Sequence, residues 1–166
     1  FSLVLLFPLH LVSGQQLNGN WCGNAEVTPW MEWYKDHRSE LSQSRSDETL
    51  YVPVTVHIIG TDQGTNLFPL DKAVQAICGM NERYTEANIQ FYLMPGDPVR
   101  FVNNSAWYEH EYFPGGQEMI QQNNIPDRLN AYVVGDPAGN CGYSWMDAIV
   151  LGSACSGANN STWSHE

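Results

Sequence analysis

Hydrophobic and polar residues alternate between Tyr51 and Ile59, where four apolar side chains share one face: Val52, Val54, Val56 and Ile58. This period of two predicts a β-strand with one face in the core. Pro53 lacks a backbone N–H, which favours an edge strand or the first residues of a strand. His57 lies on the opposite face, and we interpret it as a packed core or edge histidine rather than a ligand.

After Pro69 the period changes to three and four residues, through Leu70, Ala73, Val74, Ile77, Met80 and Tyr84. This spacing predicts an amphipathic helix. Apolar runs predict further strands at 89–93, 99–102, 129–134 and 147–151, and a short helix at 116–124. The remainder of 96–116 has no regular pattern. Alternation of strands and helices is typical of an α/β fold with a parallel sheet.

The first residues, Phe1 to Val12, are almost entirely apolar, and Ser13-Gly14 follow. The run is too short for a membrane-spanning helix, which needs about 20 residues. It fits the apolar core and cleavage site of a secretory signal peptide over residues 1–14, without an initiating Met or a basic leader. The alternative is a buried strand or helix.

Residues 15–50 form a separate zone that is rich in aromatic residues at its start and polar at its end. The stretch from Ser39 to Glu48 has almost no apolar residue to bury, so we interpret it as a linker. Arg45 is a natural cleavage site within it. An ordinary surface loop is the alternative.

Composition narrows the class of protein. With 43% hydrophobic and 15% charged residues the chain is globular. Its net charge of −11 argues against a nucleic-acid partner, which requires a basic surface. A signal peptide would place the four cysteines in an oxidising compartment: Cys22, Cys78, Cys141 and Cys155. Glycosylation sequons begin at Asn103, Asn159 and Asn160 and matter only in a eukaryotic secretory pathway.

The chain stops at Trp163-Ser164-His165-Glu166. The final pair matches the first half of a His-Glu-x-x-His helix, in which two histidines four apart bind one Zn²⁺ and the Glu polarises a water on the metal. Asn160 and Ser161 are favourable N-cap residues and predict that a helix begins here. A dipeptide occurs often by chance, so a surface His-Glu pair at a frayed end is the alternative.

In the order and spacing of its segments the chain resembles the pappalysin-type metzincin zinc metallopeptidases. The matching segments are 52–59, 81–84, 87–91, 129–134, 141–143, 147–151 and 161–166. The resemblance implies that 51–166 is the N-terminal, upper part of a catalytic domain, truncated inside the metal motif. It implies a twisted, mostly parallel sheet with packing helices. The second and third zinc histidines and the methionine turn of that family are not in this chain.

The resemblance also assigns roles. His165 would be the first zinc ligand and Glu166 the general base that transfers a proton to the leaving amine. A rim strand, formed by Gly142, Tyr143, Ser144 and Trp145, would bind the substrate as an added strand. An ordinary edge hairpin is the alternative for that strand.

Two cysteine assignments follow. Cys22 resembles the latency cysteine of such zymogens, whose thiolate occupies the fourth zinc position until a cut near Arg45 releases it. A disulfide with Cys78 or a free thiol are the alternatives. Cys141 and Cys155 flank a strand, and we predict a disulfide between them that contributes about 3 kcal/mol.

The other histidines give weaker candidates. Glu109-His110-Glu111 looks like a ligand cluster, but Pro114 occupies the position where a second histidine would be needed, so we interpret it as a solvated loop. His10 belongs to the predicted signal peptide and His37 to the propeptide. The sequence contains no glycine-rich phosphate loop and no nucleophile elbow.

The sequence therefore predicts a fragment of a secreted zinc metalloendopeptidase zymogen that acts on peptides or proteins and is inactive by itself. It predicts no nucleic-acid partner and no stable membrane association after signal removal. No residue pattern supports a Ca²⁺ requirement. The alternative is a non-catalytic, secreted interaction or scaffold module stapled by a disulfide.

Overall fold

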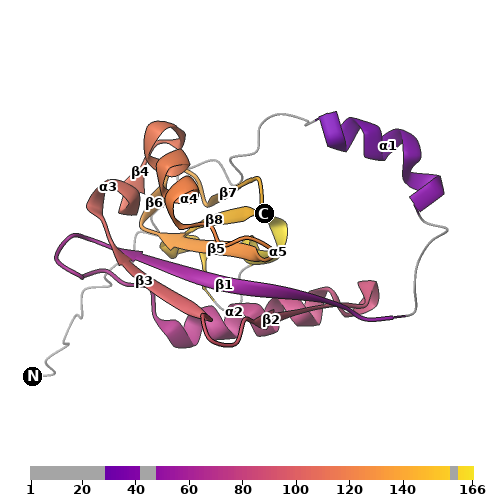
Figure 1. The fold of residues 1–166 in the computed structure, drawn as a ribbon, viewed down its shortest axis with the longest axis horizontal. Coiled ribbons are helices and arrows are strands. Elements are labelled where there is room, and N and C mark those ends of the chain that lie inside the picture. Colours follow the sequence, from indigo (N-terminus) through magenta and orange to yellow (C-terminus); the bar gives the residue numbers. More distant parts are fainter. Residues whose placement is uncertain (1–28, 42–47, 158–160) are drawn as a thin grey trace, which may run out of the picture.

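A computed structural model describes residues 29–41, 48–157 and 161–166. The predicted signal peptide 1–14, Cys22 and Arg45 lie outside these residues, as do the sequons that begin at Asn159 and Asn160. The centre of the described part is a twisted sheet with helices on both faces (Figure 1).

The sheet has six strands in the order β2-β1-β5-β8-β7, and β3 also pairs with β1. Every neighbouring pair is parallel except β7 with β8, which is antiparallel. The strands are β1 Leu50–Gly60, β2 Ile89–Leu93, β3 Val99–Asn103, β5 Leu129–Val134, β7 Gly142–Trp145 and β8 Ala148–Gly152. The predicted α/β fold with a mostly parallel sheet is confirmed.

Strand β1 lies inside the sheet, so the edge position that Pro53 suggested is wrong, whereas a place near the strand start is confirmed. The amides of Leu50 and Val56 donate to Asn88 and Pro98, on the side of β2 and β3. Since amides alternate along a strand, Pro53 faces the other side, where pairing with β5 begins only at Val54. Its missing N–H therefore removes no sheet hydrogen bond.

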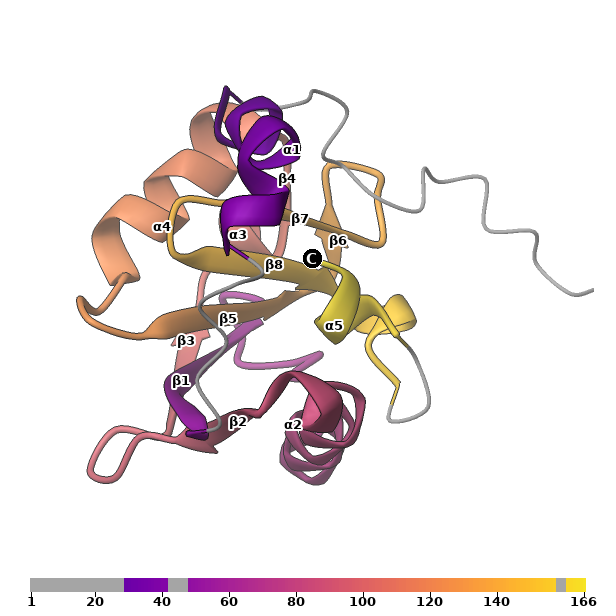
Figure 2. The ribbon, with the colours of Figure 1, turned by 90° about the vertical axis from the view of Figure 1, so that its right-hand side faces the viewer.

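Helix α2 (Leu70–Arg83) and the short helix α5 (Thr162–His165) cover one face of the sheet (Figure 2). Even-numbered side chains of β1 point to this face and pack on α2, as the two periodicities predicted. The buried residues are Val54, Val56 and Ile58 from β1, Ala73, Ile77 and Met80 from α2, and Trp163 from α5. A short 3₁₀ helix, Thr85–Ala87, ends with Asn88 in the left-handed region at φ 55° and connects α2 to β2.

The other face carries α4 (Gln117–Asn123) and the one-turn helix α3 (Ser105–Tyr108). Met119 and Ile120 of α4 pack there on Tyr132 and Val150. Between these helices the chain forms β4 (Glu109–His110), which pairs in parallel with β6 (Asp136–Pro137), and the π-type turn Tyr112–Gly116. The sequence pattern did not predict these three elements.

Helix α1 (Pro29–Leu41) lies in the zone expected to be a propeptide. The pattern did not predict this helix, and the linker expected from Ser39 overlaps its last three residues. Trp33 stacks on His37 one turn later, with ring centroids 4.5 Å apart. Among the described helices, none combines the length and apolar character needed to cross a membrane.

Candidate active site

The final helix, α5, is held in place by its buried residues. Trp163 is only 2% exposed and packs into the core beside α2. Thr162 donates its hydroxyl to the carbonyl of Cys155 at 2.9 Å, and Tyr84, the residue that follows α2, donates to the carbonyl of Ser164 at 3.1 Å. His165 is exposed, as predicted for a residue in the first turn of a new helix.

Glu166 packs against the first residue of β7. A Cβ atom placed on Gly142 would lie 2.9 Å from Cγ and 3.1 Å from Oε1 of Glu166. The same Cβ would lie 2.8 Å from the carbonyl oxygen of Val150. Glycine at 142 therefore allows the carboxylate of Glu166 to approach β7. The expected base and the expected rim strand are adjacent, although 24 residues separate them in the sequence (166 − 142).

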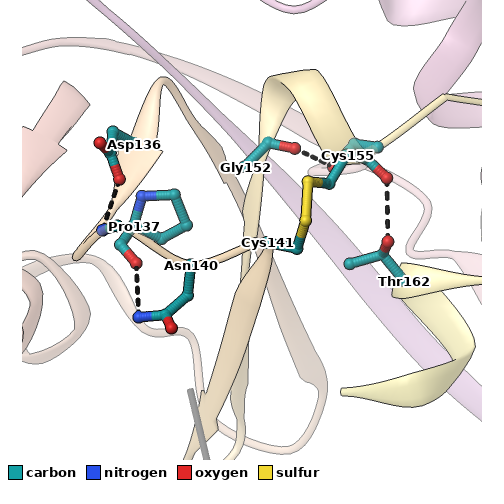
Figure 3. The surroundings of a disulfide bond; sticks show 9 residues. Asp136, Pro137, Asn140, Cys141, Gly152, Cys155 and Thr162 are labelled. Atoms are coloured by element: carbon teal, nitrogen blue, oxygen red, sulfur yellow. Dashed lines mark hydrogen bonds between the residues drawn. A yellow bond between two sulfur atoms is a disulfide. The ribbon is translucent and has the colours of Figure 1, made fainter. Parts of the chain in front are cut away.

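A disulfide joins Cys141 to Cys155, with Cα atoms 5.4 Å apart, which confirms the predicted pair. Cys141 directly precedes β7, and Cys155 ends the 3₁₀ turn Ser153–Cys155 after β8. Figure 3 shows the bridge next to the hydrogen bond from Thr162 to Cys155. One covalent link therefore connects the rim strand to the segment that anchors α5. Cys78 is exposed and forms no disulfide with a described cysteine, and the role of Cys22 stays a prediction.

Strand β7 is the last strand of the sheet that the described residues form, and its role as a substrate rim stays a prediction. Gly152 donates to the carbonyl of Cys141, so the pairs 141–152, 143–150 and 145–148 are the hydrogen-bonded ones. Gly142 and Ser144 belong to the alternate pairs and point their N–H and C=O groups away from β8. The outward direction of these groups is what strand addition by a peptide requires.

His110 supports β7 from the α4 face. Its Nδ1 donates to the carbonyl of Trp107 at 2.7 Å, so Nε2 is the acceptor for the hydroxyl of Tyr143 at 2.8 Å. Burial lowers the pKa of His110 and raises that of Tyr143. His110 is 8% exposed, so the interpretation of 109–111 as a solvated loop is wrong for this residue. It is buried because Tyr143 gives its second nitrogen a partner.

His57 is a fully buried histidine in the middle of the sheet, as interpreted from the strand pattern. Its Nε2 donates to Oδ1 of Asn130 at 3.0 Å, and its ring stacks on Tyr132 with centroids 4.3 Å apart. Nδ1 has no hydrogen-bond partner. Burial lowers the pKa of His57 to about 4, so the side chain is neutral at pH 7.

The described residues fit only part of a zinc site. His165 offers one exposed imidazole, but no group of three His, Cys, Asp or Glu side chains capable of holding a metal occurs in 29–41, 48–157 and 161–166. Catalytic zinc requires three protein ligands and an open position. The geometry supports one ligand and an adjacent carboxylate, and no catalytic step through a metal follows from these residues alone.

No protein-family profile matches the chain, and no curated protein matches it in sequence. Its structure is similar to that of a promirolysin mutant from Tannerella forsythia, with a TM-score of 0.56 and 17% sequence identity. The match covers 83% of this chain and 61% of the promirolysin chain. Promirolysin is a pappalysin-type metzincin, and at this identity the match shows that the two proteins share a fold.

Proposed function

We propose that this chain is the N-terminal part of a secreted zinc metalloendopeptidase zymogen. The observation that carries the proposal is the adjacency of α5 and β7. His165 projects from a helix that the core holds in place, and Glu166 packs on Gly142 of the last strand in the described sheet. The shared fold with promirolysin supports the same conclusion.

Each residue in this arrangement has a distinct role. β7 binds an extended peptide through the outward N–H and C=O groups of Gly142 and Ser144. Glu166 takes a proton from the attacking water and passes it to the leaving amine. His165 would supply one nitrogen ligand to zinc, which when bound would polarise the scissile carbonyl. The disulfide holds the start of β7 close to Cys155, whose carbonyl accepts the hydrogen bond from Thr162 of α5.

The sequence that follows Glu166 in the parent reading frame is the sharpest test. A histidine four residues after His165, then a glycine and a third histidine, would supply the remaining ligands. If those positions hold other residues, the zinc peptidase proposal fails.

The isolated 166-residue chain gives a second test. We expect no hydrolysis of casein, because a single histidine does not hold catalytic zinc. Cleavage that a chelator abolishes would contradict the assignment of His165 and Glu166, since the described residues form no three-ligand group.

A second candidate is a secreted interaction module without catalysis. The disulfide that staples the sheet to the turn after β8 is the observation that favours it. This function would be supported if the parent frame lacks the two further histidines.

Secretion itself rests on the apolar run 1–12 and on the disulfide, which forms in oxidising compartments. N-terminal sequencing of secreted material should find cleavage close to Gly14.

A further inference from the structure

The outer end of β7 carries an aromatic pair in which Trp145 is half-buried and Phe113 is exposed. The ring of Phe113 stands 6.3 Å from that of Trp145, edge to face at 78°. Phe113 is 66% exposed, and Met146, which follows Trp145, is 79% exposed. Large apolar side chains that stay in solvent beside the last strand of the described sheet indicate a contact site.

The backbone sets the outward position of Phe113. This residue has extended dihedral angles, φ −132° and ψ 131°, within an otherwise helical turn. Its neighbour Tyr112 instead packs on Tyr143, with ring centroids 4.9 Å apart. One side chain of the turn therefore supports β7, and the next extends along the end of the strand.

The two faces of β7 differ in chemistry. Tyr143 and Trp145 point to the α4 face, whereas the open side of Gly142 points to Glu166 on the other face. A peptide paired with β7 places each residue on the same face as the residue opposite. Its residue opposite Trp145 would therefore lie against Trp145 and Phe113. That position is a pair without hydrogen bonds, in which side chains approach most closely.

We propose that Phe113 and Trp145 form a subsite for a bulky apolar side chain of an extended peptide substrate. Gly142 and Trp145 are three positions apart in β7 (145 − 142), and antiparallel pairing reverses the direction. The apolar residue therefore lies three positions N-terminal to the residue that faces Gly142 and Glu166. This inference rests on the proposed role of β7 as the substrate strand.

The test measures binding, so it does not depend on zinc. Two fluorescein-labelled heptapeptides of Thr and Ala, one with Phe near its N-terminus and one with Ser there, are titrated with the 166-residue chain by fluorescence anisotropy. Partial burial of the phenyl ring should make the Phe peptide bind about tenfold more tightly. Phe113→Ala or Trp145→Ala should bring the two peptides within about twofold of each other.

Phe101 of β3 provides a matched control, because it is 56% exposed and distant from β7 in the sheet order. Phe101→Ala should leave the difference between the peptides unchanged. Thermal unfolding of each variant checks that it is folded, and Phe113→Ala keeps the test valid if Trp145→Ala is unstable. Equal binding of both peptides to the wild-type chain overturns the subsite, as does an equal effect of Phe101→Ala and Phe113→Ala.

A spin label on the peptide tests which residues of β7 lie opposite which residues of the bound peptide. A nitroxide placed three residues C-terminal to the Phe should broaden the NMR amide signals of Gly142 and Glu166 more than that of Trp145. Stronger broadening at Trp145 overturns the register. If neither peptide binds at about 1 mM, the subsite and the substrate role of β7 both fail. The assignment of His165 as a zinc ligand is tested separately by the parent reading frame.

Discussion

Gly142 is the residue on which the candidate site depends most directly. The space that a side chain would fill at this position is occupied by Glu166 and by the carbonyl of Val150. A glycine in a strand often marks such a close approach. The family resemblance led us to expect this strand, but only the structure shows which partner requires the glycine.

Gly142→Ala should lower the free energy of unfolding by about 1–3 kcal/mol, because the added Cβ overlaps backbone as well as the Glu166 side chain. Urea denaturation followed by tryptophan fluorescence measures the change. Gly157→Ala is the control, because a Cβ there has no atom within 4 Å and should have little effect. Equal stability of the Gly142→Ala and wild-type chains would show that Glu166 does not hold this position.

His57 should make the protein less stable in acid. Its pKa is about 4 when folded against the ordinary 6.5, so between these values the unfolded chain binds more protons. Stability should therefore fall as the pH drops from about 6.5 to 4, by about 3 kcal/mol from this residue. Urea unfolding at several pH values measures the slope, and a folded His57→Gln variant should show a shallower one. The lowered pKa of His110 acts in the same direction, so some slope should remain.

The assignment of Cys22 as the latency cysteine has a direct test. In a longer protein that carries the complete metal motif, Cys22→Ala should give peptidase activity without a cut near Arg45, because a thiolate no longer occupies the fourth zinc position. The unaltered precursor should stay inactive until that segment is cleaved. Activity assays on both uncleaved precursors decide this, and equal activities would leave Cys22 as a structural thiol.

At the scale of elements, β7, the disulfide and α5 form one connected unit. Cys141 and Cys155 link the strand to the turn after β8, and Thr162 binds the carbonyl of Cys155. The bridge joins two cysteines that are 14 residues apart in the sequence, and it therefore reduces the conformational freedom of the unfolded chain. It also gives α5, which is only one turn long, a fixed point of attachment.

Replacing both cysteines, Cys141→Ser and Cys155→Ser together, should lower the free energy of unfolding by about 3 kcal/mol. Amide hydrogen exchange should rise in β7 and around α5 before it rises in β1, because β1 is paired along both sides. Cys78→Ser is the matched control, since this exposed cysteine forms no disulfide with a described cysteine. Uniform exchange across the sheet would show that the bridge does not act locally.

The sequence predicted the elements whose burial follows a simple period. Strand β1 and helix α2 were found because their apolar residues repeat every two and every three or four positions. The buried position of His110 was missed because it depends on Tyr143, 33 residues later, and no local pattern records that contact. β4 and β6, with two residues each, are too short to show a period. The His165 and Glu166 assignment came from the motif, whereas their contact with Gly142 required the fold.

At the scale of the molecule, the two faces of the sheet support different parts of the candidate site. One face buries α2 and Trp163 of α5, and so fixes the candidate catalytic residues (Figure 2). The other face buries α4 and holds β7 through His110 and Tyr143. Both sets of contacts meet at β7, the edge of the sheet. The candidate site therefore lies where the two packed layers end.

The place of β7 at the end of the described sheet also affects how the protein behaves in concentrated solution. The last strand of a sheet can pair with the same strand of another copy, and like charge between the copies opposes this. The chain carries a net charge of −11 at pH 7, which keeps copies apart, and its pI is about 4.6. Near that pH, or in high salt, this repulsion disappears. Mildly acidic buffers are therefore expected to promote self-association, and storage well above the pI should avoid it.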